Sequence, residues 1–397
     1  MPDSSAPPDA SPSPSPAAAD AVPRPTLAVW GGSDIGCVRE DNEDSLAIGD
    51  LDAGELWDGE ATMGVRGARG LLVVVCDGMG GAQGGEVASD LAVRTVWAEM
   101  RQAQPTDELE VYARLLRRAV RAANRQVWDE AQREAALRGM GTTASALGFA
   151  GDHAVIAQVG DSRVYVFRAG VLVQVTRDQS LASALVHAGR ASQSEVHHQL
   201  GAGAILQALG VAEDCEPSLS VVELRRGDRL LVCSDGLHGQ LADGGIATVL
   251  DTLAEPHAAV DALIAAARAA GGNDNITAVV VDVGGDDLAP PASPEDLPRY
   301  TEIDPHEEGD RALYSTSYVA RRLAARVGIG EDPGPPVVPA TGQHAVLPVA
   351  RTGPGGTIAD VPGQARQRLR AGGVPLLAWV AILAIAAVLG WIAAGAW

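Results

Sequence analysis

The sequence predicts a layered α+β fold, and three observations support this prediction. Apolar runs of strand length recur along the chain, and several are joined by short connections that force antiparallel neighbours. Two longer stretches with helical apolar spacing supply elements that can cover a sheet. A hydrophobic content of 46% is enough for a full core. The expected strands are residues 71–76, 143–149, 154–159, 163–167, 171–175, 229–233 and 277–283.

The chain begins with a segment that is not expected to fold. Residues 1–25 are rich in Ser, Pro and Ala, a composition typical of disorder, and they lack the basic-then-apolar order of a signal peptide. The globular part therefore starts near Thr26. Within it, residues 50–70 carry Gly and charge between two apolar runs, which predicts a loop insertion.

Two amphipathic helices are expected between the first strands and the strand cluster. The first covers residues 86–101, where small or apolar residues recur at helical spacing. Thr106 is placed to cap a second, longer helix, with Asp107 and Glu108 in its first turn. We interpret both apolar stripes as faces toward the core.

Four aspartates, each within its own short signature, carry the functional signal. They are Asp77 in V-C-D-G-M-G-G, Asp161 in V-G-D-S-R, Asp235 in C-S-D-G-L and Asp274 in G-N-D-N-I-T. An acidic cluster, R-E-D-N-E-D, lies upstream at residues 39–44. Converging carboxylates disfavour one another's ionisation unless cations lie between them. Hard oxygen ligands without His or Cys suit magnesium or manganese, so the sequence predicts a carboxylate metal site.

Charge and cysteine usage exclude other classes of protein. A formal net charge of -21 argues against a nucleic-acid partner, which requires a basic face. The four cysteines, Cys37, Cys76, Cys215 and Cys233, form no C-x-x-C pair. We interpret them as reduced core residues of a cytosolic domain, not as a disulfide framework or a zinc site.

Taken together and in this order, the signatures resemble those of the metal-dependent protein phosphatases, the protein phosphatase 2C-like family. The bacterial serine/threonine phosphatases of this family carry the same sequence motifs: R-x-x-N-E-D, D-G-M-G-G, G-x-G-T-T, V-G-D-S-R-x-Y, S-D-G-L and G-x-x-D-N-I-T. The resemblance covers residues 26–283. It implies a four-layer α-β-β-α sandwich of two antiparallel sheets flanked by helices, with the metals at one edge.

The resemblance also implies a binuclear centre of manganese or magnesium that activates a water for attack on phosphoserine or phosphothreonine. In this assignment Asp77 bridges both ions and the Gly78 carbonyl ligates one of them. Asp235 and Asp274 ligate the other ion, and Glu43 joins the shell through water.

The remaining roles follow from the same resemblance. Arg39 is assigned to the substrate phosphate, which makes it the fourth catalytic residue beside the three ligand aspartates. The alternative for Arg39 is a surface salt bridge with Glu40 or Asp41. Asp44 is expected to support the shell by hydrogen bonding, and Asn275 to position the loop that carries the last aspartate.

Three departures from the family pattern bear on the site. Met79 stands where eukaryotic relatives have a histidine assigned as general acid, and a thioether cannot donate a proton. Asp161 matches a ligand of a third metal, but Gly239 stands where many relatives have a second carboxylate, so we expect at most a weak third ion. Residues 180–210 correspond to a flap beside the site. Its histidines are interpreted as solvent-facing residues and not as ligands: His187, His197 and His198.

The C-terminal third predicts a tether. Residues 284–373 are rich in Pro and Gly and are interpreted as a flexible linker. Residues 374–397 carry no charge and would span ~36 Å as a helix, enough for a bilayer core. Arg366, Arg368 and Arg370 precede this stretch. The positive-inside rule then predicts a single-pass anchor in the cell membrane, with the catalytic domain cytoplasmic.

The leading functional hypothesis is a membrane-anchored phosphoserine/phosphothreonine phosphatase that opposes Ser/Thr kinases. Its partners are then phosphorylated proteins, with a cognate kinase among the candidates. One alternative is a phosphoprotein-binding regulatory module with weak or lost catalysis. Another is a stage-specific phosphatase for one anti-sigma or anti-anti-sigma protein.

Overall fold

The structure is a computed structural model that describes residues 24–57, 61–65, 70–80, 84–181, 183, 205–293 and 295–303, with backbone alone for 61–65. The chain divides into two units, Met1–Val349 and Ala350–Trp397, and the second lies wholly outside the described residues. Within the described ranges, no helix has the length and apolar character needed to cross a bilayer. The predicted anchor, residues 374–397, and the three flap histidines lie outside those ranges.

Two antiparallel sheets form the centre of the first unit. In the first sheet the strand order is β10 (Val171–Gln174), β9 (Arg163–Arg168), β12 (Arg229–Cys233), β13 (Ile276–Gly284), β1 (Thr26–Asp34) and β4 (Ala61–Val65). In the second it is β14 (Tyr300–Ile303), β11 (Ser218–Glu223), β8 (His153–Val159), β7 (Ala144–Ala150), β5 (Leu71–Met79), β2 (Asp44–Asp50) and β3 (Glu55–Trp57), with the short β6 (Gly141–Thr142) paired to the end of β5.

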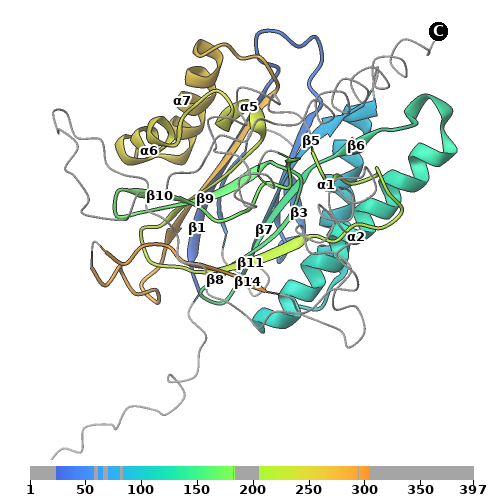
Figure 1. Ribbon diagram of the computed structural model, residues 1–397. Coiled ribbons are helices and arrows are strands. Elements are labelled where there is room, and N and C mark those ends of the chain that lie inside the picture. Colours follow the sequence, from blue (N-terminus) through green and yellow to red (C-terminus); the bar gives the residue numbers. More distant parts are fainter. Residues whose placement is uncertain are drawn as a thin grey trace, which may run out of the picture. The chain divides into compact units, whose positions relative to one another are not determined.

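The two sheets pack face to face, and helices cover their outer faces, as Figure 1 shows. Helices α1 (Gly84–Gln102) and α2 (Leu109–Arg133) cover the second sheet. Helices α6 (Asp243–Thr252) and α7 (Pro256–Ala269) cover the first. Along the chain, the 3-10 turn η2 (Ala135–Leu137) follows α2, and the short helix α5 (Asp235–His238) precedes α6. The predicted pair of antiparallel sheets flanked by helices is therefore confirmed.

Strand β5 explains why the central strands are apolar on both faces. Val73 and Val75 join the core between the two sheets, whereas Leu72, Val74 and Cys76 join the core under α1 and α2. Successive side chains of a strand point to opposite faces, so a strand in an inner layer needs an unbroken apolar run. Burial in two cores also fixes the register in which this strand delivers the residues at its end.

The second helix begins later than the sequence predicts. Its first residue is Leu109 and its N-cap is Glu108, whose side chain makes no capping hydrogen bond. The Thr106 hydroxyl accepts a hydrogen bond from the backbone N–H of Glu108 at 3.1 Å, but Thr106 lies two residues before the N-cap position. The predicted apolar stripe is nevertheless buried, as expected for a helix that packs on a sheet.

Two segments expected to be irregular contain strands. Residues 50–70 include β3 and β4, which pair with β2 and β1 at the edges of the two sheets. Past the predicted end of the domain at residue 283, Leu288 is buried and β14 pairs with β11. The described residues of the expected linker therefore include one strand of the second sheet.

The cysteines are free, as predicted, but they do not all belong to the core. Cys76, Cys215 and Cys233 are buried, whereas Cys37 is exposed on the loop between β1 and β2.

Candidate metal and phosphate site

One end of both sheets gathers the side chains that the sequence singled out. Asp44 begins β2 and lies opposite Asp77 of β5 in the antiparallel register. Asp235 follows β12 as the first residue of α5, and Asp274 stands two residues before β13. Asp161 precedes β9. The pairing of the strands therefore brings five strand ends, and one carboxylate from each, to the same end of the two sheets.

Burial and mutual repulsion shift the acidity of these carboxylates. Burial raises the pKa of Asp77 well above its ordinary value, and the charges of Asp44, Asp235, Asp161 and Asp274 raise it further. Burial, followed by the charge of Asp274, likewise raises the pKa of Asp235, and the neighbouring Asp77 side chain offsets part of this rise.

Asp44, which lies close to Asp77 and Asp235, accepts hydrogen bonds from two hydroxyl groups. Ser234 Oγ and Thr277 Oγ1 each donate a hydrogen bond to Asp44 Oδ2 at 2.7 Å. Burial nevertheless raises the pKa of Asp44 to about 7, because the two hydroxyls do not offset the loss of solvent and the nearby charges. The position agrees with the supporting role predicted for Asp44.

Arg39 faces the carboxylates and not its neighbours in sequence. Its Nη2 lies 2.7 Å from Asp274 Oδ2, and its Nη1 lies 4.0 Å from Glu43 Oε2. The side chain remains 47% exposed, so a guanidinium edge is open to solvent above the cluster. These ion pairs replace the alternative pairing with Glu40 or Asp41. A half-exposed guanidinium beside a buried acidic cluster is suited to binding a phosphate group.

Asn275 joins the two loops that carry these groups. Its Oδ1 accepts the Glu43 backbone N–H at 2.8 Å, and its Nδ2 donates to the carbonyls of Ile35 and Asp41 at 3.1 and 2.9 Å. Its own N–H donates to Asp274 Oδ1 at 2.9 Å. Asn275 therefore holds the Arg39 loop against the Asp274 loop, a wider role than the sequence indicated.

Glycine is required where two backbones meet at this edge. A Cβ on Gly78 would lie 2.2 Å from the Gly85 carbonyl oxygen and 2.5 Å from that of Glu43. A Cβ on Gly236 would lie 1.9 Å from the Asn275 carbonyl oxygen. Each D-G pair thus combines a carboxylate with a residue small enough for close backbone approach.

The G-T-T signature supports Asp77 from the other side. The Thr143 hydroxyl accepts the Asp77 backbone N–H at 2.9 Å and contacts Ser162 Oγ at 2.7 Å. The Thr142 hydroxyl donates to the Asp77 carbonyl oxygen at 2.9 Å. Both threonines are buried, so the position of the Asp77 backbone is fixed by packing as well as by hydrogen bonds.

Asp161 and His238 contact each other at the same end of the sheets. Burial, followed by the charge of Asp235, raises the pKa of Asp161 to about 7, and its buried Oδ1 makes no hydrogen bond. His238 Nε2 lies 3.0 Å from the Asp161 carbonyl oxygen, and burial lowers the pKa of this imidazole to about 4. The sequence analysis missed His238, although it directly follows the S-D-G-L word.

The donor set fits divalent cations. Buried carboxylates that raise one another's pKa, together with an unsatisfied oxygen on Asp161, are what cations would neutralise. Within the described ranges, no three acidic, His or Cys side chains form a ready-made ligand set for one ion.

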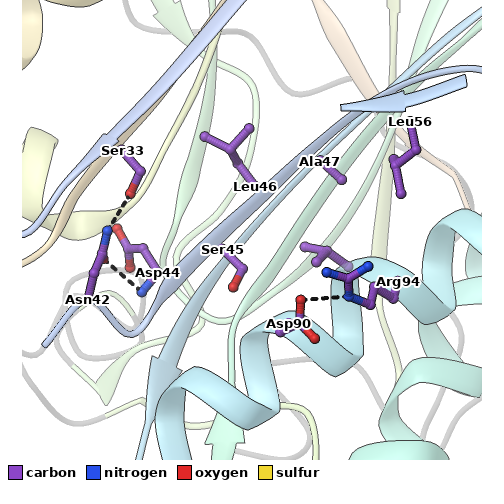
Figure 2. A pocket seen from close by; sticks show the side chains of 10 residues that line it. Ser33, Asn42, Asp44, Ser45, Leu46, Ala47, Leu56, Asp90 and Arg94 are labelled. Atoms are coloured by element: carbon purple, nitrogen blue, oxygen red, sulfur yellow. Dashed lines mark hydrogen bonds and ion pairs between the residues drawn. The ribbon is translucent and has the colours of Figure 1, made fainter. Parts of the chain in front are cut away.

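A pocket of about 290 Å³ lies between β2 and α1, and Asp44 is one of the residues that line it. Figure 2 shows Asn42 and Ser33 beside Asp44, and the Asp90–Arg94 ion pair farther along the wall. Asn42 Nδ2 donates to Ser33 Oγ at 2.9 Å, and its Oδ1 accepts the Asp44 N–H at 3.2 Å. The pocket contacts the support of the carboxylate cluster and not Asp77 itself.

Comparison with known proteins places these features in a family. A family model described as Protein phosphatase 2C matches residues 58–274. The serine/threonine protein phosphatase PstP of Mycobacterium tuberculosis is 38% identical over 253 residues, which are 63% of this chain and 44% of PstP. The serine/threonine phosphatase stp of Listeria monocytogenes is 36% identical over 214 residues, 53% of this chain and 84% of the relative. The chain therefore spans less than half the length of PstP.

Solved structures agree with the sequence relatives. The M. tuberculosis PstP crystal structure matches with a TM-score of 0.56 and 36% identity, covering 66% of this chain and all of that one. The PstP catalytic domain in complex with two manganese ions matches with a TM-score of 0.55 and 35% identity. The S. agalactiae serine/threonine phosphatase matches with a TM-score of 0.58 and 31% identity over 64% of this chain.

Proposed function

Because this chain belongs to the protein phosphatase 2C family, we propose that it is a metal-dependent phosphatase acting on phosphoserine and phosphothreonine in proteins. The observation that carries the proposal is the convergence of Asp77, Asp235 and the partly exposed Asp274 beside the half-exposed Arg39. Without cations this arrangement is unfavourable, since the charges of Asp235 and Asp274 raise the pKa of Asp77. The PstP catalytic domain in complex with two manganese ions supports a site for two ions here.

Arg39 binds the substrate phosphate. Asp274 holds the guanidinium on one side at 2.7 Å, and the exposed edge is free to form two parallel hydrogen bonds to phosphate oxygens. Arg39, which we call the phosphate clamp, is positioned by Asn275, because Asn275 joins the Arg39 loop to the Asp274 loop by hydrogen bonds. Substrate orientation thus rests on a hydrogen-bonded loop pair.

The aspartates hold the cations. The groups that would hold the ions are the carboxylates of Asp77, Asp235 and Asp274 and the Gly78 carbonyl, with Glu43 supporting them. Two manganese or magnesium ions, when bound, supply the positive charge that lowers the pKa of an attacking water and stabilises the phosphoryl oxygens. Thr142 and Thr143 hold the backbone of Asp77 by hydrogen bonds and so fix the position of this proposed ligand.

The leaving serine or threonine oxygen needs a proton. Met79 follows the D-G pair at the end of β5, and a thioether has no proton to donate. Solvent therefore supplies this proton through the open face beside Arg39. The absence of a nucleophilic side-chain step agrees with direct attack of water on phosphorus.

The full chain is also proposed to act at the cytoplasmic face of the cell membrane and to oppose Ser/Thr kinases. Support comes from the uncharged residues 374–397 and from the three arginines that precede them. An anchor of this kind raises the local concentration of membrane-bound phosphoproteins. Full-length protein should sediment with membranes and resist alkaline carbonate, and recovery in the cytosolic fraction would contradict the anchor.

The activity is tested by phosphate release from phosphothreonine peptides by the full chain. Release should depend on manganese or magnesium and stop with chelator. A protein that binds the phosphopeptide at micromolar concentration with manganese but releases no phosphate would instead be a phosphoprotein-binding module.

A further inference from the structure

The exposed large apolar side chains of the described residues are confined to the edge that carries the carboxylates. Ile35 is 37% exposed, Val38 64% and Val211 56%. Isolated exposed apolar residues are ordinary on a protein surface. Their restriction to two loops beside one site is informative, because exposed apolar groups next to a polar site mark surfaces that bind a partner.

The first two residues lie beside the predicted phosphate clamp. Gly36, between them, packs so closely on the Asp274 loop that a Cβ would lie 2.2 Å from the Asp274 carbonyl oxygen. Val38 directly precedes Arg39, whose guanidinium lies 2.7 Å from the Asp274 carboxylate. We define Ile35 and Val38 as the clamp-side patch.

Val211 lies on the other side of Asp77. A Cβ on Gly141 would lie 2.9 Å from Val211 Cγ2 and 3.5 Å from Met79 Cγ, so both side chains border the same glycine. Gly141 pairs with Met79, which stands two residues after Asp77 in β5. We define Met79 and Val211 as the strand-side patch.

We propose that the two patches bind the side chains that flank the phosphorylated residue, so that the preferred substrate is an extended phosphopeptide with aliphatic residues on both sides of the phosphothreonine. This inference rests on the function proposed above. The occupant must place a phosphate at Arg39 between two apolar contacts, which an extended peptide does with alternate side chains. A second copy of this chain is disfavoured because each copy carries a formal charge of -21.

The expected selectivity is moderate. Burial of apolar side chains favours binding, but the side chains of each patch are only partly exposed in the free protein, so binding buries little additional apolar area. We therefore expect the full chain to prefer an aliphatic-flanked phosphothreonine peptide over a serine-flanked one by about tenfold in kcat/KM.

The test uses the full chain with manganese and three substrates: the aliphatic-flanked peptide, the serine-flanked peptide and an aryl phosphate. Val38→Ser and Val211→Ser should each reduce the preference for the aliphatic peptide about threefold, and the double variant should abolish it. Val38→Ile is the matched control and should retain the preference, because it keeps an apolar side chain of similar shape.

The outcomes separate this inference from the function on which it rests. No hydrolysis of any substrate, aryl phosphate included, would remove the phosphatase assignment itself. Hydrolysis of all three with equal preference in wild type and both serine variants would overturn the docking role. A change in sedimentation from dimer to monomer in those variants, with peptide preference unchanged, would assign the patches to a contact between copies and also overturn it.

Discussion

The strands β12 and β13 have acidic residues near both ends, and the surroundings of these residues differ between the two ends. At one end, Arg168 donates two hydrogen bonds of 2.7 Å to Asp228, whose side chain is fully buried. Nearby, Arg229 pairs with Asp282 at 2.6 Å, although burial still raises the pKa of Asp282. At the other end, Asp161, Asp235 and Asp274 meet Asp77. Among the described residues, the arginines near them include the half-exposed Arg39, which pairs with Asp274, and Arg163, which pairs with Asp178.

The difference separates structural charge from functional charge within one sheet. An arginine that satisfies a buried carboxylate leaves it no capacity for another ligand. Carboxylates that raise one another's pKa are costly to the folded protein and gain stability when cations bind. The end with fewer arginine-paired carboxylates is therefore the end that binds ligands, and the first prediction below changes this end and uses the other as its control.

The largest effect is expected from Asp77→Asn. Removing the charge of a ligand that both ions share should cost several kcal/mol of transition-state stabilisation, a loss of about 10³-fold or more in kcat. Asp282→Asn makes the same chemical change at the opposite end and should leave kcat within about twofold. Steady-state kinetics on an aryl phosphate measures both, and comparable losses in the two variants would break the comparison.

Asp228→Asn should have the largest effect on stability. It leaves the buried Arg168 guanidinium without its carboxylate, and breaking a buried ion pair typically costs about 3–5 kcal/mol. Urea unfolding in the presence of chelator measures the change. A loss below about 1 kcal/mol would show that the paired end is not held by this contact.

Arg39→Ala should raise KM for a phosphopeptide about 10- to 100-fold, the value of one or two hydrogen bonds to a charged group. The fall in kcat should be smaller, because the clamp acts on ground state and transition state alike. Arg39→Lys keeps the charge without the paired donors and should lie between the two. An unchanged KM in Arg39→Ala would exclude the clamp.

The smallest effect concerns pH. Burial, followed by the charges of Asp235 and Asp178, raises the pKa of Asp161 to about 7. In chelator the folded state keeps a proton that the unfolded state loses from about pH 4 upward, so the unfolding free energy falls as pH rises to about 7. The slope for one proton is about 1.4 kcal/mol per pH unit.

Asp161→Asn should remove this contribution. Because burial lowers the pKa of His238 to about 4, this histidine contributes the opposite slope, but it does so in both proteins and cancels from their difference. Unfolding measured from pH 4.5 to 7.5 should give a shallower fall for the variant, and identical slopes would contradict the raised pKa.

Much of the fold was predictable because apolar runs record burial directly. The expected strand at 229–233 coincides with β12, since every residue in it is buried. The strands β3 and β4 were missed because they are short edge strands, which need little apolar character. Glu108 became the N-cap in place of Thr106 because tertiary packing and not local capping decides where α2 begins.

The candidate site was likewise predictable from the sequence only in part. The D-G pairs predicted which carboxylates would meet, since each follows or ends a buried strand. The contacts that hold them came only from the structure: Asn275 bridges loops 234 residues apart at Asp41, and Thr277 reaches Asp44 across 233 residues. No local pattern encodes such pairings. His238 had a local signal, its place one turn after Asp235, but its burial could not be inferred from sequence.

The account is tested most directly by the unfolding free energy of wild type and Asp77→Asn at pH 8, each in chelator and in manganese. In chelator Asp77→Asn should be at least as stable as wild type, because it removes a carboxylate whose pKa is raised well above its ordinary value. Manganese at 100 times its Kd should stabilise wild type by about 2.7 kcal/mol and the variant far less. A variant that is less stable than wild type in chelator, and that gains as much from manganese, would contradict a cluster built for cations.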